Sequence, residues 1–582
     1  MPTLNWMGKD KVVNHHRDVP YRVLVRDAEK SVLDSHGSDC GNMIIHGDNL
    51  EALKALLPEC EGKVDCIYID PPYNTGNEGW VYNDNVNDPR IQRWLGQVVG
   101  KEGEDFSRHD KWLCMMYPRL QLLRKMLAPT GAIFISIGDD ESANLRLVCD
   151  EIFGSSCFVG DVIWQKTYSP RNDSKGIPTE AEHLYVYSKN TGWMPGRLPR
   201  TAEMDQRYSS PDGDPRAWKA GDASAPGAAT HQGMVYAIQH PLTGELLYPP
   251  NGRCRPFGGY SMLNLMSEWA DYEWVDIHDE ERRAQICGVP VEEIRPGVQA
   301  LMLKNESQTT FDKARQRYEQ GSWPILYFTS HGRGGMACKR YLDEMPGRLP
   351  TNLWPYSEVG HTDEATKELK AIFEGRSPFD TPKPTRLIER ILKIATDGNS
   401  LVLDSFGGSA TTAQAVMKAN AGDGGHRRYI LVELMDYADS ITAERVRRVI
   451  SGYGSGSSAV EGIDSGFSYY ELGPALFDGD GSLNPDVTRD DLKRYVWYTE
   501  TKADFVDLSA EHPYLLGEIA GTVYYLAYEP EGETVLSYEL LSTLPRRGQT
   551  TVIYADRCAL SSEVLGELGI RFKQIPRQIA RF

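Results

Sequence analysis

The sequence has few of the features that mark metalloproteins, secreted proteins or membrane proteins. Its ten cysteines are scattered along 582 residues, with no CxxC pair and no histidine partner at zinc spacing. No apolar run reaches the roughly 18 residues of a transmembrane helix, and the amino-terminal segment has no apolar stretch of signal-peptide length. We therefore expect a soluble, cytoplasmic protein with reduced cysteines, no metal and no membrane partner.

Positive charge is also scarce, because 63 lysines and arginines stand against 82 aspartates and glutamates, a net charge of −19. Proteins that coat nucleic acid non-specifically neutralise phosphates with Lys and Arg, so the acidic total argues against that class. The acidic total does not exclude a basic cleft on an otherwise acidic protein. The composition is that of an ordinary globular chain, and at roughly 100–200 residues per domain the length predicts three or more domains.

Short apolar runs that lead into helical patterns recur in two separate parts of the chain. The first part contains MIIHGDN, VDCIYIDPPY, GAIFISIGDD and HLYVYSKN, and the second contains SLVLDSFGGSATTAQAVMKA and RYILVELMDYADSITAERVRRVI. Alternation of this kind is typical of βα units on a parallel sheet. We therefore predict one α/β sheet completed by segments that lie far apart in the sequence.

The composition divides the chain into four regions. Residues 1–190 and 376–472 are expected to form the two halves of the α/β domain. Between them, residues 191–375 are rich in Gly, Pro, Trp and Tyr, which predicts an irregular insertion with its own small domain. The Gly/Ser-rich stretch at 451–458 is typical of a linker or mobile loop. Residues 473–582 form a further unit, whose last piece is predicted to be strand, helix, strand.

The tetrapeptide Asp70-Pro71-Pro72-Tyr73 directly follows the apolar run CIYI. Two consecutive prolines remove two backbone donors and stiffen the turn, so the surface offers acceptors only. A carboxylate followed by such a carbonyl could accept both hydrogens of an exocyclic amine, while a tyrosine offers a flat face for stacking. Two interpretations stay open: a site for a flipped amino-purine or amino-pyrimidine, or a strand-ending turn in which Asp70 caps the next segment.

A second strand-to-helix turn, DSFGGSATT, runs from Asp404 to Thr412. Glycines at such a turn let the backbone approach a ligand closely, and the following helix N-terminus favours negative charge. Glu433 closes the next strand, YILVE, about where an acidic residue binds ribose hydroxyls in nucleotide-binding α/β folds. The pattern predicts a nucleotide-like cofactor, and the alternative is a glycine turn that serves packing alone.

Taken together, the DPPY tetrapeptide, the DxFxGS turn, the TPKP at 381–384 and the GDN after MIIH resemble the motifs of amino-methyltransferases that act on DNA adenine. Their order, with a large insertion between DPPY and the cofactor turn, resembles the β-class arrangement. GKDKVVNHHRDVPYRVL, HDKWLCMMYPRLQLLRKML and GFSYYELG further resemble modification subunits of type III restriction-modification systems. The resemblance implies a Rossmann-like, circularly permuted methyltransferase sheet, an inserted target-recognition domain and a small carboxy-terminal α/β domain.

The resemblance also implies roles for the DPPY residues and for one later strand. Asp70 and the Pro71 carbonyl would hold the target amine, in a turn that Pro72 stiffens, and Tyr73 would stack on the flipped base. In EHLYVYSKN, the side chains of His183 and Tyr185 would form the other wall of the base pocket. Side-chain alternation in a sheet explains those last two nearly as well.

The implied cofactor is S-adenosylmethionine. Glu433 would take its ribose, Asp48 would lie near its adenine, and Thr381 and Lys383 would lie beside its methionine end. Ala410 stands where the family usually has a second glycine, so we expect a slightly shifted turn there. The full set of residues implied to line the cofactor site is Asp48, Thr381, Lys383, Asp404, Phe406, Gly408, Ser409 and Glu433.

The implied reaction is site-specific methyl transfer to N6 of an adenine that is flipped out of duplex DNA. The implied partners are double-stranded DNA, a second copy of the chain assembled through 473–582, and a restriction or helicase-nuclease subunit. Two alternatives stay open: an N4-cytosine methyltransferase, and a DNA-recognition scaffold with a decayed cofactor site. The basic residues expected to read DNA in the insertion, unless it is merely a solvated domain, are Arg253, Arg255, Arg333, Lys339 and Arg340.

Overall fold

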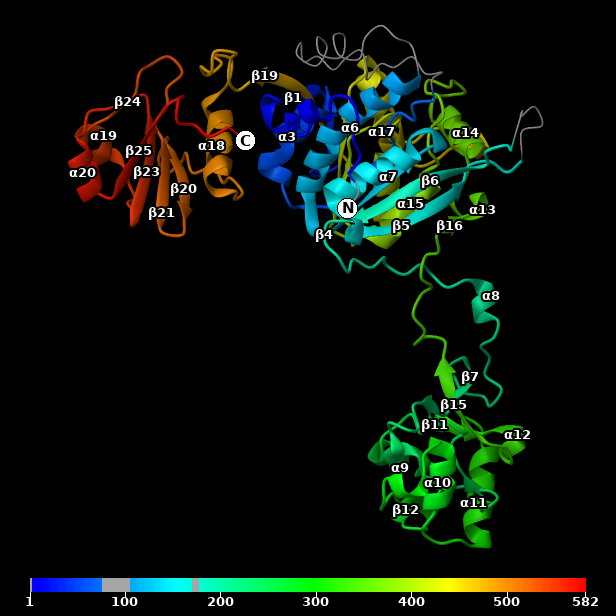
Figure 1. Ribbon diagram of the computed structural model, residues 1–582. Coiled ribbons are helices and arrows are strands. Elements are labelled where there is room, and N and C mark those ends of the chain that lie inside the picture. The colour runs from blue at the N-terminus through cyan, green and yellow to red at the C-terminus, as the bar shows by residue number, and fades with distance from the viewer. Residues whose placement is uncertain (1–2, 76–104, 170–176, 582) are drawn as a thin grey trace. The chain divides into compact units, whose positions relative to one another are not determined.

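The computed structural model describes residues 3–75, 105–169 and 177–581 and divides the chain into two compact units (Figure 1). One unit combines Met1–Gly196 with Leu349–Phe582, and the other is Arg197–Arg348. The second unit lies inside the insertion expected at 191–375, whereas residues 349–375 group with the first unit. None of the described helices is both long enough and apolar enough to cross a membrane.

The first unit is built on a ten-stranded sheet. Six of its strands, from β19 to β4, run parallel. At one side β1 pairs antiparallel with β19; at the other, β6 pairs antiparallel with both β4 and β5, and β16 pairs parallel with β5. The predicted α/β sheet, completed by distant segments, is confirmed. In spatial order the strands are β1 (Arg22–Val32), β19 (Phe467–Ala475), β2 (Met43–His46), β18 (Arg428–Glu433), β17 (Leu401–Asp404), β3 (Val64–Ile69), β4 (Leu127–Ile137), β6 (Ala181–Ser188), β5 (Phe158–Gln165) and β16 (Leu353–Trp354).

Helices cover both faces of this sheet. On β4, Ile133, Ile135 and Ile137 pack in one apolar cluster with α3 (Asn49–Cys60), α6 (Asp105–Met126) and α7 (Asp139–Phe153), as strand alternation requires. The helices of the second layer follow the unit Arg197–Arg348 in the sequence, and they contact one another and the strands. They are α14 (Thr362–Ile372), α15 (Thr385–Ala395), α16 (Thr411–Asp423) and α17 (Glu444–Ser451).

The carboxy-terminal region contains a smaller four-stranded sheet. Its last piece is β23, α20 and β25, so the predicted strand, helix, strand order is confirmed. Apolar side chains of these strands pack in two clusters, one of which includes the helix α18. The elements are α18 (Arg489–Thr501), β20 (Leu515–Ile519), β21 (Thr522–Leu526), β22 (Val535–Leu536), α19 (Tyr538–Thr543), β23 (Thr550–Ala555), β24 (Arg557–Cys558), α20 (Ser562–Glu567) and β25 (Ile570–Gln574).

The unit Arg197–Arg348 has an aromatic core of its own, centred on Trp218, Trp269 and Tyr327. A buried Lys339 lies 2.6 Å from both Asp212 and Asp214 beside that core, which ties the strand pair β7 and β15 to the chain before it. The longer elements are β7 (Trp218–Asp222), α9 (Gly259–Met266), β12 (Tyr272–Val275), α10 (Glu280–Cys287), β13 (Ala300–Leu303), α11 (Gln308–Glu319), β14 (Leu326–Phe328) and β15 (Met336–Tyr341).

Candidate active site

Four neighbouring parallel strands carry acidic residues at their carboxyl ends. The strands β2, β18, β17 and β3 lie side by side, and Asp48, Glu433, Asp404 and Asp70 end or closely follow them. The carboxyl ends of parallel strands meet at one edge of a sheet, and ligands of open α/β folds bind there. The tertiary structure therefore gathers residues from both ends of the sequence along a single edge.

Asp70 forms the tightest charge pair at this edge. The Lys383 ammonium lies 2.8 Å from one carboxylate oxygen of Asp70 and 2.6 Å from the other. Burial raises the pKa of the Asp70 carboxyl above its usual range, while the lysine charge opposes that rise. The two residues were assigned to different ligands by the sequence analysis, so their direct pairing joins the expected base site to the expected cofactor site.

The DPPY turn is held in place by a hydrogen bond from α6. The indole N–H of Trp112, a buried residue of α6, donates to the Pro72 carbonyl at 2.7 Å. The Tyr73 ring lies under the Lys383 ammonium, 5.0 Å from the ring centroid, which is cation–π distance. Pro72 thus contributes a structural bond as well as stiffness, and Tyr73 already has a charged group over its face.

Glu182 is a residue of this site that the sequence analysis missed. Its carboxylate accepts the Tyr73 hydroxyl at 2.8 Å and the Lys166 ammonium at 3.1 Å, and it lies 3.7 Å from the Lys383 ammonium. Its side chain is only 10% exposed. Burial by itself would raise the pKa of Glu182, but Lys383 and Lys166 outweigh burial and hold the pKa below its usual range. A charged residue inside an otherwise apolar strand, AEHLYVYS, was the available signal.

The structure does not bring His183 and Tyr185 to the Tyr73 ring. Neighbours in a strand point to opposite faces, so both residues lie on the face of β6 opposite Glu182. His183 contacts Asp161 at 3.1 Å and Asp139 at 3.2 Å, and Tyr185 joins the apolar cluster of α6 and α7. The place expected for them at the base pocket is occupied by the side chain one position earlier.

The glycine turn is closed by two buried carboxylates. Asp404 accepts the Thr412 hydroxyl at 2.6 Å and the Phe406 N–H at 3.0 Å, and burial raises the pKa of Asp404 to about 8. Glu433 accepts the Gly408 N–H at 2.7 Å and the Met435 N–H at 3.0 Å, and burial raises its pKa too. Each carboxylate therefore shapes the backbone of the turn in addition to lining it.

The groups at the turn fit a ligand that carries hydroxyls and positive charge. Gly408 has a left-handed φ of 48°, and a Cβ there would come within 3.2 Å of the Phe379 ring. A side chain would thus fill the space beside the backbone. The buried carboxyl groups of Asp404 and Glu433 can accept hydrogen bonds from hydroxyls, and a cationic ligand beside them would lower their raised pKa values. The donor set is consistent with S-adenosylmethionine.

A buried arginine supports the turn from behind. Arg445 on α17 donates to the Ser409 carbonyl at 3.0 Å, to the Ser409 hydroxyl at 3.0 Å and to the Thr411 hydroxyl at 2.9 Å. It also donates to Gln414 at 2.8 Å and lies 3.8 Å from Glu368. Because Ser409 faces this arginine, its hydroxyl is engaged within the protein. Arg445 has no motif signature, and only the packing of α17 on α16 reveals it.

Ala410 occupies the position where a second glycine was expected, and its backbone explains that expectation. It has φ 62° and ψ 33°, the left-handed region, and caps the amino terminus of α16 while fully buried. This conformation costs a residue with a Cβ about 1–2 kcal/mol, which a single alanine tolerates. The turn thus places an alanine in the left-handed geometry that favours glycine.

We expect an Ala410→Val substitution to lower the free energy of unfolding by about 2 kcal/mol, because a β-branched side chain is strained at positive φ and overpacks a buried site. Chemical denaturation of both proteins measures the difference. Ala410→Gly is the control and should stay within about 1 kcal/mol of the parent, since strain relief offsets the lost methyl group and the added chain entropy. A valine variant of unchanged stability would contradict the strained turn.

Asp48 and Thr381 are placed differently from the other expected cofactor residues. Asp48 caps α3 by accepting the Leu50 N–H at 2.8 Å, and its second oxygen lies 3.0 Å from Arg119. Thr381 is exposed and has a left-handed φ of 49° just before Lys383. Both lie on segments that border the turn, and Asp48 has a structural function as a helix cap.

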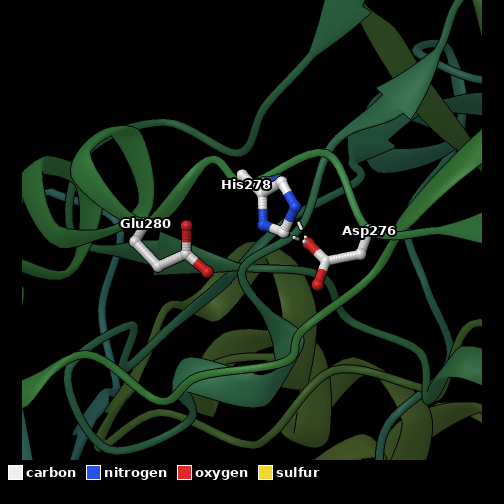
Figure 2. A group of neighbouring side chains, drawn as sticks. All are labelled: Asp276, His278 and Glu280. Atoms are coloured by element: carbon white, nitrogen blue, oxygen red, sulfur yellow. Dashed lines mark hydrogen bonds and ion pairs between the residues drawn. The ribbon is translucent and has the colours of Figure 1, made fainter.

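Among the described residues, one group of side chains has the composition of a metal site. Asp276, His278 and Glu280 in the second unit bring their ligand atoms within 4.8 Å of one another. Figure 2 shows the imidazole between the two carboxylates, and His278 pairs with Asp276 at 3.5 Å. The His278 side chain is 83% exposed. Side chains this accessible are hydrated, so the arrangement by itself assigns no ligand.

Two of the five basic residues expected to read DNA are buried, which corrects that expectation for them. Arg255 is 3% exposed and donates to the Tyr236 and Leu247 carbonyls, and Lys339 is 1% exposed between two aspartates. A buried cation needs partners within the protein, so neither residue can reach a groove edge. Arg333 and Arg340 are exposed, and Arg253 pairs with Asp222.

Comparison with known proteins defines the class. The sequence model of the DNA methylase family (N6_N4_Mtase) matches residues 64–444, which is more than half of the chain. The chain therefore belongs to this family of DNA methylases, and the resemblance inferred from DPPY and the glycine turn is confirmed. The matched range begins at β3, just before DPPY, and ends at the start of α17.

Individual relatives narrow the comparison. The chain is 32% identical over 500 residues to the type III restriction-modification enzyme StyLTI Mod subunit of Salmonella typhimurium, covering 81% of this chain and 66% of that protein. It is 30% identical over 444 residues to the EcoPI Mod subunit of Escherichia phage P1, covering 74% and 63%. The EcoP15I Mod subunit of Escherichia coli is 28% identical over 503 residues, covering 81% and 71%. The chain thus spans about two thirds of the length of these relatives.

Proposed function

We propose that this chain transfers the methyl group of S-adenosylmethionine to N6 of an adenine flipped out of duplex DNA, as the modification subunit of a restriction system. The observation that carries the proposal is the pair of Asp70 and the glycine turn at adjacent strand ends, β3 and β17, joined through Lys383. Membership of the DNA methylase family and the similarity to type III Mod subunits support it.

The proposed reaction needs acceptors and alignment. S-adenosylmethionine supplies an activated methyl group when bound. Asp70 and the Pro71 carbonyl would accept the two amine hydrogens, which favours a nitrogen whose lone pair is free to bond to carbon. The bond from the methyl carbon to sulfur would break as the bond to nitrogen forms, and the Asp70 carboxylate would take the proton that the amine gives up. The Tyr73 ring would stack on the extruded base, and a cleft that holds both reactants would supply the near-attack alignment, about 3–3.5 Å, that such a transfer needs. Extrusion of the base costs a few kcal/mol.

Long-read sequencing of DNA from cells that express the protein tests this function. We expect modified adenines at one sequence motif. Cytosines that carry an N4 methyl group would instead favour an N4-cytosine methyltransferase. Unmodified DNA together with undetectable S-adenosylmethionine binding by calorimetry would favour a DNA-recognition scaffold.

A Glu433→Ala variant is expected to weaken S-adenosylmethionine binding chiefly. It removes the proposed ribose acceptor and also frees the Gly408 N–H that shapes the turn. A lost hydrogen bond to a charged group is worth roughly 1.5–3 kcal/mol, so the Kd should rise about 10- to 150-fold in a titration. Glu471→Ala is the control and should leave the Kd unchanged. Glu471 lies on β19, and its carboxylate pairs with His46 and Lys30. Equal Kd values for the Glu433 variant and the parent would limit Glu433 to a structural role.

We further propose that residues 473–582 serve assembly, either of two copies of this chain or with a restriction subunit. Every residue assigned to the amine or the cofactor precedes this segment, and the segment folds around a sheet of its own. Analytical ultracentrifugation of the full chain gives the oligomeric state. Sedimentation as a monomer at all concentrations would rule out self-association through this segment.

A further inference from the structure

Two carboxylates and two lysines share the space beside the Tyr73 ring. Lys383 lies on Asp70 at 2.6 Å and 3.7 Å from Glu182, whose other oxygen lies 3.1 Å from Lys166. The side chains of Lys383 and Glu182 are 11% and 10% exposed. Charges this well shielded from water interact strongly. Removal of one carboxylate would therefore shift the lysine ammonium groups toward the carboxylate that is left.

The Lys383 pair conflicts with the role proposed for Asp70. Both Asp70 oxygens accept from the lysine, so the ammonium takes lone pairs and space that a target amine would need on the same carboxylate. The lysine can release Asp70 only if another acceptor takes its charge. Glu182 is already at ion-pair distance, 3.7 Å, about an ångström beyond hydrogen-bond contact, and the rings of Tyr73 and Trp164 border the ammonium at 5.0 Å and 5.9 Å. A short movement of Lys383 from one carboxylate to the other is therefore available.

Glu182 also holds the proposed stacking ring. The Tyr73 hydroxyl donates to the same oxygen of Glu182 that faces Lys383, at 2.8 Å. A tyrosine fixed at its hydroxyl and packed against Gly138 loses little further freedom when a base stacks on it. One buried carboxylate thus touches both groups on which capture of the base depends.

We propose that Glu182 is a positioning residue of the base site, which fixes Tyr73 through its hydroxyl and takes Lys383 from Asp70 so that Asp70 can accept the target amine. The inference rests on the proposed function for its substrate. It assigns Glu182 no contact with the base, and it deepens the account of how the acceptor becomes available.

The charge of Glu182 should also be visible in the pH dependence. Burial is the main cause that raises the pKa of Asp70, and the negative charge of Glu182 adds to it. Neutralising Glu182 removes that contribution, so the pKa of Asp70 falls and the acidic limb of the kcat profile moves to lower pH. The groups that face Asp70 and set this limb are Lys383, Glu182, Tyr68, Tyr73 and Asp404.

Two variants separate the two parts of the role. Glu182→Gln keeps an acceptor for the Tyr73 hydroxyl but removes the charge, and we expect kcat to fall about 10- to 100-fold with the KM for DNA within about threefold, together with the shift in pH. Tyr73→Phe keeps the charge and the stacking face but loses the hydroxyl, and we expect a fall of about three- to tenfold without a shift of the acidic limb to lower pH, because the lost hydroxyl is a group that lowers the pKa of Asp70. Glu364→Gln, which neutralises a similar carboxylate paired with Arg386, is the matched control and should leave both kcat and the pH profile unchanged.

A Glu182→Gln variant with kcat within about twofold of the parent and the same acidic limb would overturn the proposal. If the parent protein itself transfers no methyl group, the proposed function fails, and crystal structures still decide the positioning role. Displacement of the Tyr73 ring in Glu182→Leu, but not in Glu182→Gln, would support it. A ring that keeps its position in both variants would refute it.

Discussion

An Asp70→Ala variant is expected to lose methyl transfer by about a hundredfold or more, because it removes the carboxylate proposed to accept the target amine. The affinity for S-adenosylmethionine should change by no more than about threefold, since Asp70 follows β3 and the glycine turn follows β17. Single-turnover assays measure the rate, and calorimetry measures the affinity.

The expected separation of rate from affinity depends on Lys383 remaining compensated. In the alanine variant this lysine still has the Glu182 carboxylate within 3.7 Å, so the lysine keeps a counter-charge and the site should stay folded. Asp70→Asn is the matched control, because it keeps one acceptor oxygen at the same place and should retain more activity than alanine. A rate within about tenfold of the parent would remove Asp70 from the mechanism.

Arg445→Met is expected to lower the free energy of unfolding by about 3 kcal/mol, because it leaves Glu368 short of a cation and the Ser409 carbonyl and Gln414 without their donor. Methionine keeps a similar volume, so the loss reports the charge and its hydrogen bonds more than a cavity. Denaturant titration measures the change.

Arg447→Met is the matched control for this substitution. It lies two residues along the same helix, where its side chain is 25% exposed and pairs with Asp439. An exposed pair contributes about 1 kcal/mol or less, so this variant should be nearly as stable as the parent. Equal losses at positions 445 and 447 would show that the turn does not depend on its buried arginine.

The sequence predicted most of the sheet and of the glycine turn because both depend on local sequence patterns. Buried parallel strands are short apolar runs, and each ends in a polar turn, so β3, β17 and β18 could be placed with the acids that follow them. The left-handed backbone of Ala410 follows from the glycine expected there. The position of DPPY just after a strand follows from the same pattern.

Other parts of the site depend on which strand lies beside which. β6 runs antiparallel between β4 and β5, and only that pairing aims Glu182 at Tyr73 and turns His183 away. A shift of one residue in this register would exchange the two side chains, and nothing local fixes the register. The pairing of Lys383 with Asp70 likewise joins two segments separated by the whole insertion.

By itself the sequence determined that this chain has an α/β sheet with the DPPY tetrapeptide and a glycine turn at two strand ends, because each motif needs only its own backbone and the strand before it. The tertiary structure alone decided which buried charges meet: Glu182 with Tyr73 and Lys166, and Arg445 with Ser409 and Glu368. The physical reason is that an ion pair or hydrogen bond depends on distances of about 3 Å between side chains, which the packing of distant segments sets.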